Sequence, residues 1–284
     1  MNDNDKLYRY LFQNRAVRGE WVRLNQTFSD TLNTHLYPKA VQNLLGEMMV
    51  ATNLLTATLK FNGNITLQIQ GSGPLKLALV NGTDDQKIRA LARLQGEIRE
   101  DMNLIEMVGK GVLVITIAPT EGERYQGVIS LDKPTVTECL EEYFARSEQL
   151  QTYLLIRTGE FNGELVTAGM LLQVMPDGSG SPEDFEHLMT LTATVKDEEI
   201  FSLSAEELLY RLYHEETVEI FPPHKVQFYC GCSQERSGAA LLLLPDEEIN
   251  DILREHNGSI DMQCECCSTH YFFNKETISR LKQG

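Results

Sequence analysis

Five of the six cysteines in this 284-residue chain lie beyond residue 229, in two tight clusters. The first cluster is Cys230 and Cys232, and the second is Cys264, Cys266 and Cys267. Two short cysteine loops of this kind are typical of a tetrahedral metal site, and thiolate sulfur favours Zn²⁺. The sequence therefore predicts that the C-terminal part of the chain folds around zinc, with sulfur atoms that are also chemically reactive.

The two clusters offer five thiols for four ligand positions. Cys230 and Cys232 supply one pair as a CxC motif. The second pair is either Cys264 with Cys267, as CxxC, or Cys264 with Cys266. A CxxC turn lets backbone amides point at sulfur, which favours Cys267 and leaves Cys266 as a small neighbour or a resolving thiol. A closed four-sulfur site has no open position for a substrate water, so metal-dependent hydrolysis is not expected.

Other chemically active residues are weaker candidates, and we expect the chain not to be an enzyme. Cys139 lies on the apolar face of an expected helix and is interpreted as a small core residue rather than a nucleophile. His270 could replace a sulfur ligand, but four cysteines already suffice. The remaining histidines considered show no spacing with carboxylates that indicates catalysis: His187, His214, His224 and His256.

Charge and hydropathy limit the possible partners and compartment. The net charge of −16 disfavours binding to nucleic acid or to anionic membranes. No apolar run reaches the length of about 18 residues that a membrane-spanning helix needs. The N-terminus lacks the basic and apolar regions of a secretory signal, so we expect a cytoplasmic protein. In that reducing compartment, clustered cysteines indicate metal or redox chemistry rather than structural disulfides.

Residues 1–176 have the pattern of an α+β core domain. Apolar residues at helical spacing over 40–60 predict a helix, and the alternation of Ile65, Leu67 and Ile69 with polar residues predicts a strand within 59–82. A β-branched run at 112–117 predicts a buried strand, and 135–150 an amphipathic helix. Strands at 153–156 and 169–175 are expected to close the sheet. Strands and helices segregate, which favours an antiparallel-rich sheet.

Residues 177–225 are expected to form a helical linker. The segment 176–182 is rich in Pro, Gly and Ser and marks a break. Residues 183–216 predict short helices, one of which starts with a capping box at Ser204 and Glu207. This stretch is strongly acidic, so its helices repel one another and should depend on docking to another surface. The linker is thus a candidate for switching between order and disorder, and an ordinary solvated helical face is the alternative.

Residues 226–284 form the expected C-terminal module. Helices are predicted at 245–256 and 276–282, with the second cysteine cluster in a loop over 258–273. So short a segment has a thin hydrophobic core and usually needs a metal or a disulfide to fold. Loss of the metal should therefore unfold this module.

Sequence motifs spread over nearly the whole chain match one family. The sequence resembles the redox-regulated molecular chaperone of 33 kDa, the heat shock protein 33 family. The matching segments are residues 10–12, 16–20, 54–61, 121–128, 143–150, 169–173 and 212–216, the Cys230 and Cys232 pair, and residues 264–274.

The resemblance implies an ATP-independent holdase that is inactive while reduced and zinc-bound. In the family, four thiols hold zinc, here Cys230, Cys232, Cys264 and Cys267 by position. Peroxide or hypochlorous acid oxidises them to two disulfides, Cys230–Cys232 and Cys264–Cys267, and zinc leaves. The zinc module and the linker then lose structure, and the activated form dimerises and binds unfolding proteins. Cys266 departs from the family pattern, in which the residues inside the CxxC motif are not cysteine.

Two other function classes make different predictions. A zinc-ribbon binding module for nucleic acid predicts basic residues around the cysteines, but only Arg236 and Lys275 lie close in sequence. A thiol-disulfide oxidoreductase predicts a CxxC motif at the start of a helix. Here the motif is followed by the strand-like residues 270–273.

Overall fold

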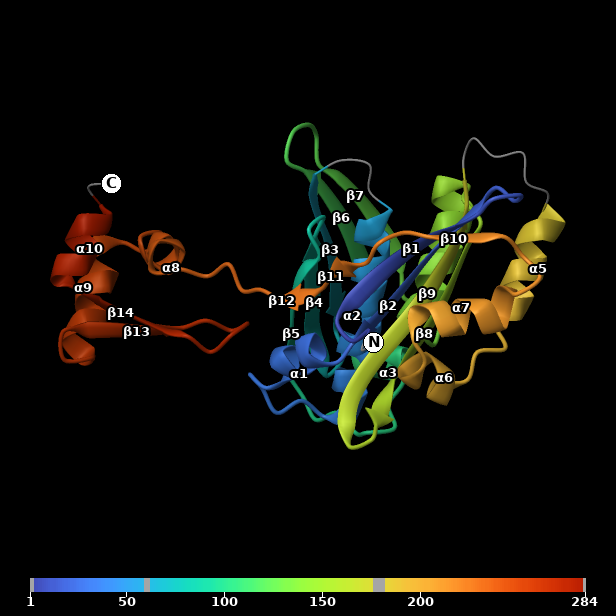
Figure 1. The fold of residues 1–284 in the computed structure, drawn as a ribbon. Coiled ribbons are helices and arrows are strands. Elements are labelled where there is room, and N and C mark those ends of the chain that lie inside the picture. The colour runs from blue at the N-terminus through green and yellow to red at the C-terminus, as the bar shows by residue number, and fades with distance from the viewer. Residues whose placement is uncertain (1–2, 59–61, 176–181, 283–284) are drawn as a thin grey trace. The chain divides into compact units, whose positions relative to one another are not determined.

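The computed structural model describes residues 3–58, 62–175 and 182–282 (Figure 1). Its chain divides into two compact units, Met1–Phe228 and Tyr229–Gly284. The expected break at 176–182 lies outside the described residues except for its last residue, Pro182, and so do residues 59–61 of the predicted strand region.

The first unit contains two six-stranded sheets. One sheet, here called sheet A, has the order β10-β1-β2-β9-β8, with β11 also paired to β1, and all of its pairs are antiparallel. Its strands are β1 (Lys6–Phe12), β2 (Val17–Leu24), β8 (Thr152–Phe161), β9 (Glu164–Val174), β10 (Val218–Ile220) and β11 (His224–Lys225).

The second sheet, sheet B, has the order β12-β5-β4-β3-β6-β7. Only its β12–β5 pair is parallel. Its strands are β3 (Gly63–Gly71), β4 (Leu75–Thr83), β5 (Lys87–Leu94), β6 (Gly111–Pro119), β7 (Tyr125–Ser130) and β12 (Gln227–Phe228). The antiparallel-rich α+β class is confirmed. The prediction that strands near 153–156 and 169–175 close a single sheet is wrong, because β8 and β9 belong to sheet A.

The helix α2 (Lys39–Ala57) separates the two sheets. It packs against β2, β8 and β9 of sheet A and against β3, β4 and β5 of sheet B. Most of its residues are buried, including Met48, Met49 and Leu54, as expected for a helix with apolar residues on all sides. The helix predicted over 40–60 is confirmed, although it ends at Ala57. The short helices α1 (Gln26–Leu32) and α3 (Leu104–Val108) complete this part of the unit.

The amphipathic helix predicted over 135–150 is only half regular. The helix α4 covers Val136–Tyr143, and a π-helical turn, η1, follows over Phe144–Glu148. The Tyr125 and Tyr143 hydroxyl groups both donate to Glu148 Oε1, at 2.9 and 2.8 Å, which stabilises the wider turn. Cys139 is 1% exposed in α4, and burial raises the pKa of its thiol, which confirms its interpretation as a core residue.

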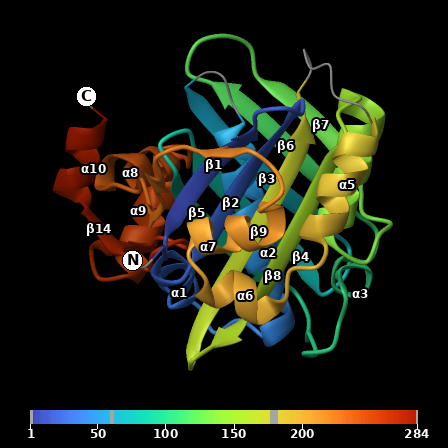
Figure 2. The ribbon, with the colours of Figure 1, turned by 45° about the vertical axis from the view of Figure 1, so that its right-hand side comes forward.

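Three linker helices cover the face of sheet A opposite α2: α5 (Pro182–Thr192), α6 (Asp197–Ser202) and α7 (Ala205–Tyr213) (Figure 2). Their apolar residues form a second hydrophobic core with the sheet, and this core includes the only tryptophan, Trp21. The capping box of Ser204 and Glu207 is confirmed at the start of α7. The Arg23 Nη1 atom donates to the Leu203 carbonyl at 2.8 Å, so polar contacts add to the docking.

One ion cluster ties the linker to the β1–β2 hairpin. The Arg15 Nε atom lies 2.7 Å from Glu216 Oε2, and its Nη1 atom pairs with Asp184. His187 Nε2 lies 3.2 Å from Glu216 Oε1. The hydrogen bond from Arg15 holds the pKa of Glu216 below its ordinary value of 4.5. This cluster therefore stabilises the docked linker while Glu216 is ionised.

Acid is expected to loosen the linker. Because the folded-state pKa of Glu216 is depressed, its contribution is complete above the ordinary value of 4.5 and is lost as the pH falls through the lower folded value. The emission of Trp21, which is buried under the linker, should therefore shift to the red during acid titration. The Glu216→Gln variant should show a shallower titration, and an identical titration would contradict this role.

The second unit is small. It contains α8 (Gln234–Leu241), α9 (Asp246–Glu255), a hairpin of β13 (Ser259–Gln263) and β14 (His270–Asn274), and α10 (Lys275–Leu281). The two helices predicted in this region are confirmed as α9 and α10, whereas α8 was missed because it is short and contains Gly238. A side chain at that glycine would clash with Leu281, since its Cβ would lie 2.3 Å from Leu281 Cδ1. The core consists of six residues: Leu241, Ile249, Leu253, Ile260, Phe273 and Ile278.

Candidate metal centre

Two short loops of the second unit carry the cysteine clusters. The first loop precedes α8, where Ser233 caps the helix by accepting from Arg236 N at 3.2 Å. The Arg236 guanidinium also donates to the Gly231 carbonyl at 2.6 Å, which fixes the turn between Cys230 and Cys232. Both cysteines are therefore held by the helix start that follows them.

The second loop connects β13 to β14. Ser268 N donates to the Cys264 carbonyl at 2.8 Å, and Cys264 N donates to the Thr269 carbonyl at 2.9 Å. Ser268 adopts a positive φ of 57°, so the chain reverses tightly there. This turn brings Cys264 and Cys267 to the same side of the loop.

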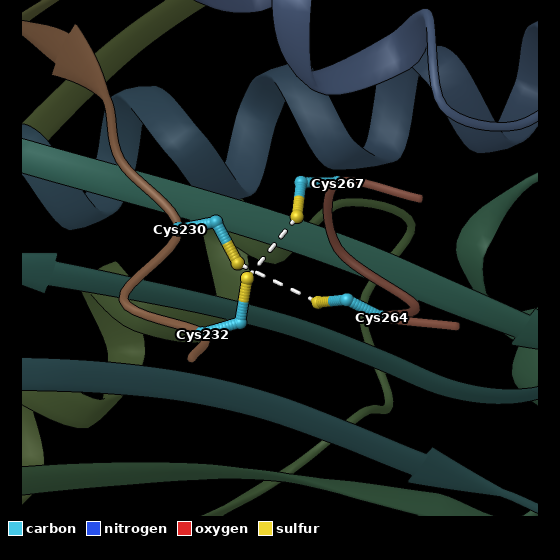
Figure 3. Close-up of side chains that lie close together, drawn as sticks. All are labelled: Cys230, Cys232, Cys264 and Cys267. Atoms are coloured by element: carbon cyan, nitrogen blue, oxygen red, sulfur yellow. Dashed lines mark hydrogen bonds between the residues drawn. The ribbon is translucent and has the colours of Figure 1, made fainter. Parts of the chain in front are cut away.

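The four sulfur atoms of Cys230, Cys232, Cys264 and Cys267 point at a common centre (Figure 3). They all lie within 4.8 Å of one another. Two contacts join the two loops, at 3.6 Å between the sulfurs of Cys230 and Cys264 and at 3.3 Å between those of Cys232 and Cys267. A tetrahedron with metal–sulfur bonds of about 2.3 Å has sulfur–sulfur edges of about 3.8 Å. The donor set therefore fits a tetrahedral thiophilic ion such as Zn²⁺.

The electrostatics of the thiols also fit a cation. Burial raises the pKa of Cys230 and of Cys232. Burial acts in the same direction on Cys267, but hydrogen bonds from Thr269, Cys232 and Cys230 together lower the pKa of Cys267 to about 7. Four thiolates at this spacing repel one another, and a bound dication would favour the deprotonated form of all four.

Two hydroxyl groups beside the thiols were missed in the sequence. The Tyr271 hydroxyl donates to Cys232 Sγ at 3.0 Å, and Thr269 Oγ1 lies 3.2 Å from Cys267 Sγ. Residues 269 and 271 are two apart, which places them on one face of an extended segment. That alternation was the available signal, but nothing in the sequence indicated that this face meets the cysteines.

The other candidates of this region lie outside the sulfur group. Cys266 lies in sequence between Cys264 and Cys267, which both belong to the sulfur group, and its side chain is buried at 7% exposure. His270 Nδ1 lies 2.9 Å from both carboxylate oxygens of Asp261, on the neighbouring strand. Among the described residues, the four converging cysteines are the only His, Cys, Asp and Glu group close enough to share a metal ion.

Removal of Cys266 is expected to leave metal binding intact. The Cys266→Ala variant keeps the four converging sulfur atoms, so it should bind one Zn²⁺ per chain. The Cys267→Ala variant removes one of the four and should bind zinc much more weakly. Metal content after gel filtration, measured on both variants, checks this. Equal zinc loss in both would contradict the ligand choice.

The fold and the site together define a protein with an α+β core, helices docked on that core and a four-thiol centre of the metal-binding type. The family model described as Hsp33 protein matches residues 5–274, and the chain belongs to the Hsp33 family. Among the described residues, no helix is both long enough and apolar enough to cross a membrane.

The similar relatives are named 33 kDa chaperonin. The chain is 79% identical over 284 residues to the 33 kDa chaperonin of Mannheimia succiniciproducens, covering 100% of this chain and 96% of the relative. It is 80% identical over 280 residues to the 33 kDa chaperonin of Actinobacillus succinogenes, covering 99% and 97%. The crystal structure of the 33 kDa chaperonin of Thermotoga maritima has the same fold, with a TM-score of 0.83, 22% identity and 98% of each chain covered.

Proposed function

We propose that this protein is a redox-regulated, ATP-independent chaperone that binds unfolding proteins and prevents their aggregation. It is inactive while its thiols are reduced and hold zinc. The observation that carries this proposal is the convergence of four cysteine sulfurs within 4.8 Å in a chain of the Hsp33 family. The function is binding rather than catalysis.

Zn²⁺ is the proposed cofactor, held by Cys230, Cys232, Cys264 and Cys267. When bound, it keeps the thiols deprotonated and supplies the folding energy of the C-terminal unit. Oxidation by peroxide converts the thiolates to the disulfides Cys230–Cys232 and Cys264–Cys267. Disulfide sulfur is a poor ligand, so the ion is lost and the small core of this unit cannot keep its fold.

The linker helices are the proposed switch element. We assign residues 1–176 to the core domain, 177–225 to the linker and 226–284 to the redox-switch domain. The burial of α5, α6 and α7 on one face of sheet A supports this role, because their release uncovers a large apolar surface. That face and the apolar sides of the helices are the proposed binding surfaces for clients.

The proposed partners are unfolded or unfolding proteins in the cytoplasm. The oxidised form is proposed to be a homodimer, and neither nucleic acid nor a membrane is a proposed partner. The net charge of −16 supports the exclusion of nucleic acid, because it repels phosphate backbones. The same charge keeps chaperone–client complexes in solution.

Light scattering from a heat-unfolding client tests this function. The zinc-loaded reduced protein should leave aggregation unchanged, and the protein treated with hydrogen peroxide should suppress it at a near-stoichiometric ratio without ATP. A thiol reductant should reverse the effect. Equal suppression by both forms, or suppression by neither, would contradict a redox-regulated holdase.

A further inference from the structure

One edge of the metal centre is lined by side-chain hydroxyl groups. The Tyr271 hydroxyl donates to Cys232 Sγ at 3.0 Å, and Thr269 Oγ1 lies 3.2 Å from Cys267 Sγ. The two sulfurs that they contact also lie 3.3 Å from each other across the two loops. The Tyr271 hydroxyl therefore contacts the CxC pair, and the Thr269 hydroxyl contacts the CxxC pair.

The position of Tyr271 is set by the β13–β14 hairpin rather than by the loop that carries Cys230 and Cys232. Tyr271 pairs with Met262 across β13 and β14, and its half-buried ring packs against the small core of the unit. The neighbouring residues His270 and Phe272 project from the opposite face and stack on each other, with ring centroids 6.2 Å apart. The strand β14 thus holds the hydroxyl against Cys232, which lies in the other cysteine loop.

We propose that Tyr271 is a positioning residue that slows the oxidation of Cys232 by hydroperoxides. This inference rests on the proposed redox function and adds a determinant of its sensitivity. Oxidation begins when the Cys232 thiolate attacks a peroxide oxygen, so that an S–O bond forms, the O–O bond breaks and hydroxide leaves. The Cys230 thiolate then attacks the sulfenic sulfur and displaces a second hydroxide. Two thiolates lose two electrons in total, and one peroxide gains them.

The hydrogen bond opposes the first of these steps. A phenol that donates to a thiolate stabilises its negative charge and occupies one of the lone pairs that would attack peroxide. In the transition state the charge moves from sulfur to the departing oxygen, so this stabilisation weakens. The hydrogen bond therefore stabilises the thiolate more than the transition state and raises the activation free energy. Cys232 reacts more slowly than it would without Tyr271.

The Tyr271→Phe variant tests the proposal, because it removes only the hydroxyl group. Zinc-loaded protein is treated with hydrogen peroxide, quenched by alkylation and analysed by mass spectrometry for each cysteine pair. The Cys230–Cys232 disulfide should form about three- to tenfold faster than in the unmodified protein. The transfer of zinc to a chelator without peroxide should stay nearly unchanged.

Matched variants separate this role from a general loss of structure. Thr269→Val removes the other hydroxyl and should accelerate oxidation at Cys267 rather than at Cys232. Tyr210→Phe removes an exposed hydroxyl, on a residue 73% exposed in α7, and should change neither rate. An unchanged rate in Tyr271→Phe, equal acceleration of both pairs, or loss of zinc before peroxide is added would each contradict the proposal. If the unmodified protein itself forms no disulfide with peroxide, the proposed redox function fails instead.

Discussion

Replacement of Cys264 by serine is expected to unfold the C-terminal unit while leaving sheet B of the first unit folded. The variant loses one of four converging sulfur ligands. Zinc binding contributes about 10–16 kcal/mol to the folding of small zinc modules, far more than so small a core can supply. Amide hydrogen exchange should therefore show β13 and β14 exchanging at the rates of an unfolded chain, with β3 and β4 still protected.

The same variant should release part of the chaperone activity without oxidant, because the reduced unit already lacks its metal-bound fold. Cys266→Ala is the matched control, since it removes a cysteine of the same loop from outside the sulfur group. It should keep both the protection of β13 and β14 and the inactive state. Normal zinc affinity in Cys264→Ser would show that Cys264 is not a ligand.

Truncation of Leu208 to alanine is expected to free the linker helices while zinc stays bound. Leu208 is 1% exposed in α7 and belongs to the core between the linker and sheet A. A buried Leu→Ala change costs about 2–5 kcal/mol of stability, and here it destabilises the docked state of the linker. The reduced, zinc-loaded variant should therefore suppress client aggregation and show red-shifted Trp21 emission.

Tyr210→Ala is the control for that change. Tyr210 lies in the same helix but is 73% exposed, so its truncation leaves the docked core intact. It should change neither the emission of Trp21 nor the activity of the reduced protein. If Leu208→Ala lowers the stability of the linker but the reduced variant remains inactive, linker docking does not control the activity.

The parts of the structure that depend on local sequence could be predicted well. The cysteines of each loop are sequence neighbours, so their spacing alone indicated a thiol centre. The start of α7 was predictable because the side chains of Ser204 and Glu207 each accept a hydrogen bond from the other residue's backbone amide within one turn. The apolar pattern over 40–60 indicated a helix, and its burial between two sheets explains why the apolar residues are not confined to one face.

Sheet A was harder to predict because its strands carry buried charges. Glu20 and Arg23 are 2% and 3% exposed in β2, although their residue types indicate a surface strand. Burial raises the pKa of Glu20 to about 7, and Arg23 reaches the Leu203 carbonyl of the linker. The partner of Arg23 is distant in sequence, and a pattern within the strand does not reveal it.

The π-helical turn and the hydroxyl groups at the metal centre also depend on residues distant in sequence, so local patterns did not predict them. The turn after α4 depends on Tyr125, which belongs to a strand of sheet B. The contact between Tyr271 and Cys232 joins residues 39 positions apart. Both features depend on tertiary contacts, so the sequence named the residues without indicating their roles.

The most direct test of the account follows zinc release, Trp21 emission and client aggregation in one sample after hydrogen peroxide is added. Zinc is expected to leave first. The emission should then shift to the red as the linker undocks, and aggregation should stop with the same time course as that shift. A reductant with added zinc should restore the original emission. Chaperone activity that appears while Trp21 stays buried, or zinc loss that leaves both the emission and the aggregation unchanged, would contradict the central claim.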